Sequence, residues 1–219
     1  MSELTIRKIE IRDLDKIADV HKASFDDRAL SQLGKTAIKR YYDWLLMGFP
    51  DNYPICATSE DDQIAGFCFA GDYSGSFTGF LKRHRCFLIS RVLLRPWLIF
   101  NPLIRKQSNL ALRTLLRLLR TKNKTRALSS HPKDQVKQAR SFQSYGILAI
   151  AVNPNYQRQG VGQALMDAAE TKAIADGYQH MHLSVHPDNF PAVRFYQKLG
   201  WQKKPPDENW SGKMTKNLN

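Results

Sequence analysis

The most restrictive feature of this sequence is an apolar run that leads through a polar loop into a glycine-rich helix start. Residues 145–152 read YGILAIAV, and an apolar run of this kind is typical of a strand buried on both faces. Gly160 and Gly162 then stand at the first turn of a helix expected over 161–176. Because glycine lacks a Cβ atom, backbone N–H groups can approach an anion closely there, and the helix start adds unpaired donors. This unit predicts an α/β fold with an anion site that suits two phosphates better than one.

The rest of the chain supplies the other elements of one α/β domain. With 219 residues, 42 % of them apolar, the chain can build a sizeable core. We expect a single domain over residues 1–219, without internal repeats. Strands are expected at 4–9, 55–58, 63–70, 179–185 and 212–218, and helices from Leu14 and over 32–47 and 189–199.

The positive charge of the chain is confined to one segment. The net charge is +13, yet residues 80–140 alone hold 16 Lys and Arg and one acid, Asp134, so the remainder is close to neutral. We therefore expect a basic helical insertion at about 76–143. Within it, leucines recur at helical spacing and arginines gather on an adjoining side, which predicts a cationic amphipathic helix. These residues are Leu112, Leu115, Leu116 and Leu119 with Arg113, Arg117 and Arg120.

Three roles for this insertion stay open. The leucine stripe can pack on the body of the domain or on a second subunit, which allows a homodimer. The arginine face can also contact an anionic membrane surface, or it can form one wall of a site for an anionic acceptor. No nucleic-acid partner is expected, since the arginines alternate with leucines and not with exposed aromatic residues.

Cysteine and histidine usage predicts neither disulfides nor a metal site. Three cysteines, Cys56, Cys68 and Cys86, form no even framework and no metal-binding pair, which favours a reducing compartment. His180 and His182 would share one face of a strand, but no third ligand stands near them in the sequence. Packing or surface roles are therefore favoured for both histidines.

No segment predicts secretion or membrane insertion. Residues 1–8 alternate polar and apolar side chains and lack the apolar core of a signal peptide. The longest apolar stretch, 87–100, is broken by Arg91, Arg95 and Pro96 and is shorter than the roughly 20 residues of a spanning helix. We expect a cytoplasmic protein, with peripheral membrane association as an option of the basic insertion.

Two sequence blocks together resemble one enzyme family. Residues 150–165 read IAVNPNYQRQGVGQAL and residues 189–201 read NFPAVRFYQKLGW, a pair similar to the GNAT N-acetyltransferase superfamily. A dinucleotide-binding fingerprint is disfavoured because Leu165 stands where a third glycine is needed. The resemblance implies the GNAT fold, in which helices flank a mixed, mostly antiparallel central sheet, and an enzyme that transfers acetyl groups from acetyl-CoA.

The resemblance also implies roles for individual residues. The backbone of 150–152 would pair with the pantetheine arm, the segment 158–163 would hold the pyrophosphate, and Asn189 would contact the cofactor. Tyr196 would protonate the departing thiolate, which suits a phenol that keeps its proton at neutral pH. The implied cofactor-binding residues are Ile150, Ala151, Val152, Arg158, Gln159, Gly160, Val161, Gly162, Gln163 and Asn189, and the implied catalytic residue is Tyr196.

The sequence departs from the family at the general base and leaves the acceptor open. Ser184 stands where relatives that acetylate protein N-termini often carry a glutamate, and a serine cannot take up a proton unaided. Asp72, Asp26 and His84 are candidates for that role, as is a chain of water molecules. We expect a small-molecule amine acceptor. The Leu- and Arg-rich insertion resembles those of acetyltransferases from surface-polysaccharide pathways, and this resemblance implies a nucleotide-linked amino sugar as the acceptor. The alternative is a GNAT-fold module that binds a membrane or a partner with little catalysis.

Overall fold

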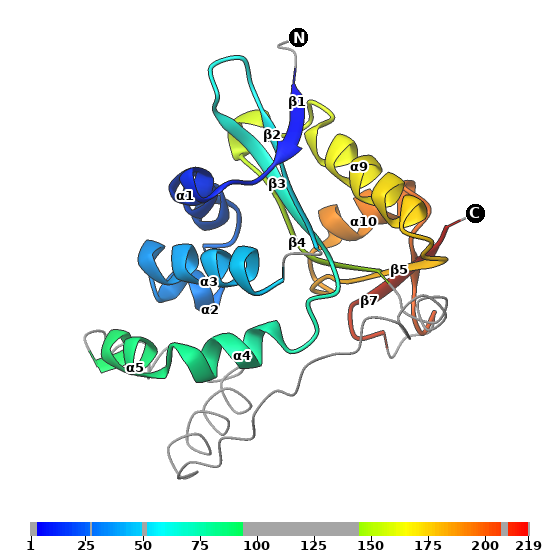
Figure 1. Ribbon diagram of the computed structural model, residues 1–219. Coiled ribbons are helices and arrows are strands. Elements are labelled where there is room, and N and C mark those ends of the chain that lie inside the picture. Colours follow the sequence, from blue (N-terminus) through cyan, green and yellow to red (C-terminus); the bar gives the residue numbers. More distant parts are fainter. Residues whose placement is uncertain (1–3, 27, 50–51, 94–144, 207–209, 219) are drawn as a thin grey trace.

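A computed structural model describes residues 4–26, 28–49, 52–93, 145–206 and 210–218. Helices cover both faces of one central sheet (Figure 1). The helices are α1 (Leu14–Ser24), α2 (Ala29–Gln32), α3 (Lys35–Gly48), α4 (Ser76–Arg83), α5 (Arg85–Leu93), α9 (Val161–Ala175) and α10 (Phe190–Lys198), with short 3-10 turns η1 (Ile11–Asp13) and η3 (Pro154–Tyr156). The strands are β1 (Thr5–Lys8), β2 (Tyr53–Thr58), β3 (Ile64–Gly71), β4 (Tyr145–Val152), β5 (His180–Ser184), β6 (Gln202–Lys203) and β7 (Lys213–Asn217).

The sheet is mixed and mostly antiparallel, as the sequence predicts. Its order is β1-β2-β3-β4-β5-β7-β6, and only the β4–β5 pair is parallel. That pair is short: residues 145–147 lie opposite 181–183, and the register ends there. The second half of β4 therefore pairs with β3 on one side, and none of the described strands pairs with it on the other. The sheet opens at its centre, next to the start of α9.

A β-bulge in β4 changes which side chains face each layer. Phe69 lies opposite Ala149 whereas its neighbour Ala70 lies opposite Ile147, so Leu148 is the extra residue. Ile147 packs in the core under α9 and α10, while Ala149 packs in the core under α1 and α3. Leu148 is left 38 % exposed at the bulge. Because of the bulge at Leu148, the odd-numbered residue before it packs on the α9 side of the sheet and the odd-numbered residue after it packs on the α1 and α3 side.

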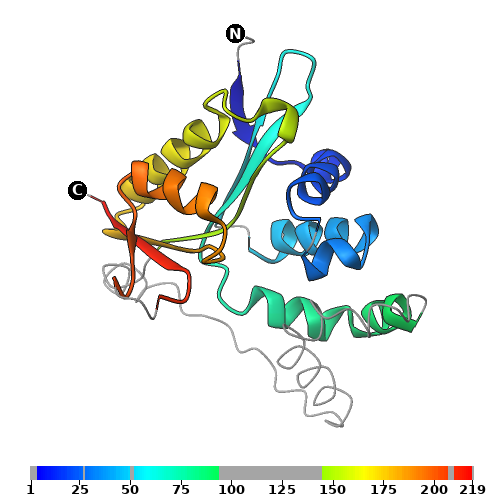
Figure 2. The same ribbon diagram turned by 180° about the vertical axis from the view of Figure 1, so that it is seen from behind.

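Each face of the sheet has its own core. The α9 side is built from Val161, Leu165, Met166, Ala169 and Ala173, which recur at helical spacing and are all buried. On the opposite face, α1 and α3 contribute a second apolar cluster with the aromatic residues of β3. Figure 2 shows α9 and α10 on one side and α1 to α3 on the other, with α4 and α5 running on beyond α3.

The structure corrects one helix boundary, adds two short elements and describes only part of the insertion. The helix expected over 32–47 begins at Lys35, because Gly34 adopts a φ of 93° and caps the start of α3; the short helix α2 before it was not expected. The two-residue strand β6 has too little apolar pattern to be predicted. Of the basic insertion, only α4 and α5 lie in the described part; the helix expected over 108–120 lies outside it, and its three roles stay predictions. In the described ranges no helix is long and apolar enough to cross a membrane.

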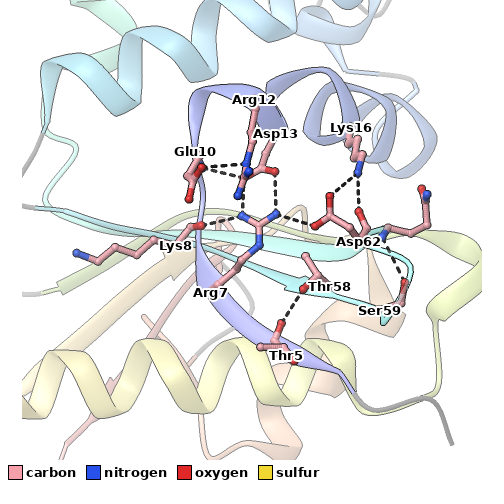
Figure 3. A network of polar contacts seen from close by, with 11 residues as sticks. Thr5, Arg7, Lys8, Glu10, Arg12, Asp13, Lys16, Thr58, Ser59 and Asp62 are labelled. Atoms are coloured by element: carbon pink, nitrogen blue, oxygen red, sulfur yellow. Dashed lines mark hydrogen bonds and ion pairs between the residues drawn. The ribbon is translucent and has the colours of Figure 1, made fainter.

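A charged network ties the first strand to the β2–β3 hairpin (Figure 3). The guanidinium of Arg7 donates to both oxygens of Asp13, at 2.7 and 2.8 Å, and the backbone N–H of Glu10 donates to Asp13 Oδ2 at 2.8 Å. Asp13 is only 2 % exposed. Asp62, at the hairpin turn, accepts from Arg7 and from Lys16. The network fixes η1 and α1 against the edge of the sheet.

Candidate active site

The first cavity lies where β4 opens away from β5, between the starts of α9 and α10. We call it the α9–α10 cavity; its volume is about 990 Å³. Of the eleven residues predicted for the site, ten line its wall: Ile150, Ala151, Val152, Arg158, Gly160, Val161, Gly162, Gln163, Asn189 and Tyr196. Gln159 does not line it; its side-chain amide turns back and donates to the carbonyl oxygen of Asn155 at 3.1 Å. The fold thus gathers two sequence blocks into one wall.

The start of α9 presents donors to this cavity. Gly160 adopts a left-handed φ of 81° as the cap residue, and Arg158 before it also has a positive φ of 61°. The first bond of the helix runs from the Ala164 N–H to the Gly160 carbonyl at 3.0 Å. The N–H groups of residues 161–163 therefore have no acceptor within the helix. This is the geometry of an anion site, with the helix dipole aligned to favour negative charge.

Two further cationic side chains, which the sequence did not single out, line the cavity. Arg194 and Lys198 lie one turn apart on α10, and with Arg158 they place three positive side chains around the wall. No acidic side chain is among its described lining residues. Their spacing of four residues on a predicted helix could have indicated that they share one face, but the sequence analysis considered only Asn189 and Tyr196 of this block. A ligand with several phosphates suits this wall.

Gly162 allows α9 and α10 to approach at the cavity. A Cβ atom there would lie 3.3 Å from Phe195 Cζ and 3.6 Å from Val152 Cγ2. We expect Gly162→Val to weaken binding of acetyl-CoA, the cofactor that the sequence resemblance implies, by about tenfold or more, since its methyl groups would crowd the donors at the helix start; tenfold corresponds to about 1.4 kcal/mol. Gly162→Ala should have a smaller effect. Calorimetric titration measures both, with Thr171→Val on the exposed side of α9 as control; equal affinities for all three variants would contradict the expectation.

Tyr196 stands in the walls of two cavities. It is 8 % exposed and packs against Phe195 and Trp201, with ring centroids 5.3 and 6.2 Å away. Burial raises the pKa of its phenol above the ordinary value, and the nearby Cys68 adds to the rise. Its hydroxyl makes no hydrogen bond to the residues that the structure describes. The phenol therefore keeps its proton at neutral pH, and the residue borders both cavities.

Asn189 has a structural role as well as a place in the wall. Its side-chain oxygen accepts from the Ala192 N–H at 3.3 Å, and so it caps the start of α10. The residue lines the α9–α10 cavity and the second cavity described next. A cap and a ligand contact are compatible, because the amide nitrogen of the side chain is not used by the cap.

The second cavity lies on the α1 and α3 side of β4 and meets the first at Tyr196. We call it the α1–β4 cavity; it has a volume of about 490 Å³. Ile150, Asn189, Ala192 and Tyr196 line both cavities. The other described lining residues are mostly aromatic or apolar and include one arginine, Arg28, and no acid.

A third cavity of about 260 Å³ adjoins the second. We call it the Asp72 cavity, since Asp72 and His182 both line it. It shares four lining residues with the α1–β4 cavity: Ile147, Leu148, Leu183 and Ser184. The serine that replaces the family's glutamate is thus exposed at the junction of these two cavities.

The three sequence candidates for the general base lie in different places. Asp72 is in the wall of the third cavity. Asp26 and His84 line none of the three cavities, and His84 instead packs against Phe80 and Trp44. His180 is on the surface, where its Nδ1 pairs with Asn217 at 3.0 Å. Within the described residues, no group of three or more His, Cys, Asp or Glu side chains is placed to hold a metal.

Comparison with known proteins places the site in a family context. The model of the Acetyltransferase (GNAT) family matches residues 110–201. Among solved structures, Ard1 from Thermoplasma volcanium is similar with a TM-score of 0.55 and 18 % identity, covering 99 % of this chain and 98 % of that one. The PaiA N-acetyltransferase from Thermoplasma acidophilum, solved with coenzyme A, gives 0.56 and 15 %, covering 98 % and 99 %.

Curated relatives match over about a third of this chain or less. Mycothiol acetyltransferase of Actinosynnema mirum is 34 % identical over 65 residues, which are 30 % of this chain and 22 % of that protein. The [ribosomal protein bS18]-alanine N-acetyltransferase of Escherichia coli K12 is 34 % identical over 61 residues, or 28 % and 41 %. The chain therefore spans well under half the length of these two relatives.

Proposed function

We propose that this chain, whose residues 110–201 match the model of the GNAT acetyltransferase family, is an N-acetyltransferase that moves the acetyl group of acetyl-CoA directly onto a primary amine. One observation carries this most: Tyr196 stands between a cavity suited to a pyrophosphate and a second cavity open to an acceptor. The first cavity holds the cofactor in this proposal and the second holds the amine. The tyrosine is the group that both would reach.

Different groups of the described residues have different roles in the proposed reaction. The N–H groups at the start of α9, with Arg158, Arg194 and Lys198, hold the phosphates. The unpaired half of β4 offers backbone groups to the pantetheine arm. Acetyl-CoA supplies the thioester that the amine attacks. Tyr196 holds a proton next to the sulfur and releases it as the thiolate leaves.

For the acceptor, we propose a small anionic amine, with a nucleotide-linked amino sugar as the first candidate. Support comes from the α1–β4 cavity, whose described wall has Arg28 and no acid, and from the positive charge that the sequence carries over residues 80–140. Aromatic side chains from α1 and α3 offer faces for a ring. A lysine-rich or polyamine acceptor would find no opposing charge in that wall.

The relatives favour a second candidate, the amino terminus of a protein. One curated relative acts by its name on an alanine of ribosomal protein bS18, and another, from Sulfurisphaera tokodaii, is an N-alpha-acetyltransferase. The absence of the glutamate at Ser184 weighs against this acceptor here. That glutamate is a feature of relatives that acetylate protein amino termini, so its absence is compatible with an amino-sugar acceptor whose proton another group removes.

Binding and turnover test the proposal separately. We expect acetyl-CoA and CoA to bind in a calorimetric titration, with affinity that falls as salt rises because the wall is cationic. No heat at millimolar ligand would contradict the cofactor assignment. Release of free CoA thiol is then followed with UDP-linked amino sugars, an alanine-starting peptide and spermidine. Turnover only with the peptide or with spermidine would overturn the anionic acceptor and leave the cofactor assignment standing.

A further inference from the structure

The two helices that follow β3 form a strongly cationic segment. Over residues 76–93, α4 and α5 contain Lys82, Arg83, Arg85 and Arg91 but no Asp or Glu. The two helices lie end to end along the edge of the layer that α1 to α3 form (Figure 1). One long side of the pair therefore faces α3, and the other side faces away from it.

Apolar residues of this pair turn toward α3, whereas its cations turn outward. Phe80 is 1 % exposed and Leu88 is 4 % exposed, and both belong to the core built with α1 and α3. Four other residues are exposed and form what we call the α4–α5 surface: Phe77, Lys82, Arg83 and Arg85. A division into apolar and cationic sides is typical of helices that lie on a membrane.

The charges of the α4–α5 surface are not neutralised by the residues around it. In the part of the chain that the structure describes, none of its three cations takes part in an ion pair. Two more arginines add to the positive charge close by. The guanidinium carbon of Arg40, on α3, lies 4.1 Å from the centroid of the Phe87 ring, and that of Arg91 lies 5.4 Å from the same centroid.

His84, between α4 and α5, responds to these charges. Burial lowers the pKa of His84, the positive charges of Arg40 and Arg83 lower it further, and Asp43 raises it. The imidazole is therefore neutral at neutral pH. Arginines from α3, α4 and α5 thus give this side of the molecule a positive field that attracts an anionic partner.

An anionic membrane fits this surface better than a nucleic acid does. Single-stranded nucleic acids are bound by several exposed aromatic side chains set among cations, whereas Phe77, at 51 %, is the one exposed aromatic residue of the described α4 and α5. A bilayer needs cations for its phosphates and an apolar side chain that can enter the interface. The sequence continues the same charge, because residues 94–140 add 12 Lys and Arg and one acid.

We propose that the α4–α5 surface docks this protein on a membrane that exposes anionic phospholipids. Lys82, Arg83 and Arg85 lie at the phosphate layer in this arrangement, and the Phe77 ring enters the interface beside them. The inference is independent of the proposed acetyl transfer, since none of these four residues lines any of the three cavities.

Docking has a consequence for the acceptor side of the molecule. Residues 71–74, just before α4, line the Asp72 cavity, which shares lining residues with the α1–β4 cavity. The surface therefore begins next to these cavities in the chain. A docked protein holds its acceptor-side cavities near the membrane.

Co-sedimentation of the full chain with vesicles tests the proposal. We expect binding to vesicles of phosphatidylcholine with roughly one third phosphatidylglycerol, little binding to pure phosphatidylcholine, and weaker binding as salt rises. Each cation close to an anionic surface is worth about fivefold in the partition coefficient. A triple variant with Lys82→Gln, Arg83→Gln and Arg85→Gln should therefore lower that coefficient by about 10²-fold.

A matched variant separates the local surface from the total charge. Lys8→Gln, Lys22→Gln and Lys204→Gln together remove the same charge from exposed residues outside α4 and α5, and this variant should bind nearly as well as the wild type. Phe77→Ser should weaken binding several fold. The thermal unfolding midpoints of both triple variants should match that of the wild type, which shows that the substituted proteins are folded.

Three results would overturn the docking: no binding to the anionic vesicles near physiological salt, equal binding to both kinds of vesicle, or equal losses in the two triple variants. Release of the bound protein by single-stranded RNA, at less RNA phosphate than lipid phosphate, would assign the surface to nucleic acid instead. None of these results bears on acetyl-CoA binding, which calorimetric titration tests separately.

Discussion

Replacing Tyr196 by phenylalanine is expected to lower kcat by about 10²- to 10⁴-fold, the usual worth of a positioned general acid. The substitution removes one oxygen atom and leaves the ring to pack against Phe195 and Trp201 as before. The hydroxyl makes no hydrogen bond to a described residue, so its loss leaves no partner unpaired. Affinity for acetyl-CoA should therefore change by no more than a few fold.

Steady-state kinetics and calorimetric titration on the same variant check this separation. Tyr178→Phe is the matched control, since Tyr178 packs on Tyr145 and lines none of the three cavities. It should keep wild-type kcat. Because burial raises the pKa of Tyr196, the wild type should keep its activity well into the alkaline range. Equal losses of kcat and of cofactor affinity in Tyr196→Phe would remove the proton-donor role.

Removing the Asp13 carboxylate is expected to produce the largest loss of stability, about 3 kcal/mol or more. Asp13 is 2 % exposed and accepts two bonds from Arg7 and one from the Glu10 backbone (Figure 3). Asp13→Ala leaves the Arg7 guanidinium, whose side chain is 24 % exposed, without its main partner. Urea unfolding measures the change. Asp62→Ala is the control: Asp62 bonds the same arginine but is 65 % exposed, so its removal should cost less than about 1 kcal/mol.

The same pair predicts a dependence of stability on pH. The hydrogen bonds from Arg7 hold the pKa of Asp13 below its usual value. A carboxylate of lowered pKa stabilises the fold fully above its unfolded pKa of about 4 and loses that contribution as pH falls through the folded value. The difference between wild type and Asp13→Ala should therefore be constant above pH 4 or so and shrink below it. A difference that grows in acid would contradict this account.

The elements with strong periodicity were predictable, and the features that depend on pairing were not. Residues 145–152 form a strand with the predicted bounds, and α9 follows the apolar spacing that begins at Val161. The bulge at Leu148 and the short β4–β5 register depend on neighbours far along the chain, so no local pattern reveals them. The α1–β4 cavity and the Asp72 cavity are both lined by Ile147 and Leu148, which lie at these two features. The sequence named Asp72 and Ser184 in connection with the general base, but it could not show that their side chains line adjoining cavities.

Within the candidate site, backbone chemistry was easier to predict than side-chain direction. The glycines at 160 and 162 mark a turn whose conformation the structure shows. Gln159 lies between them and Arg158, yet its side chain folds back onto Asn155. Arg194 and Lys198 stand two residues before and two residues after Tyr196 on α10, and residues at that spacing do not share a helix face, so the direction of Tyr196 gave no indication of them.

The short β4–β5 register has a consequence that hydrogen exchange can reveal. Beyond Ile147, alternate backbone amides of β4 point away from β3 into the opening of the sheet, where the described residues supply no strand to pair with them. In a buried strand such amides ordinarily exchange slowly, but here protection depends on what fills the opening. A pantetheine arm lying along the strand would act as its missing neighbour. The exchange rates of a few amides between 148 and 152 should therefore report cofactor occupancy directly, slow in the presence of CoA and fast without it.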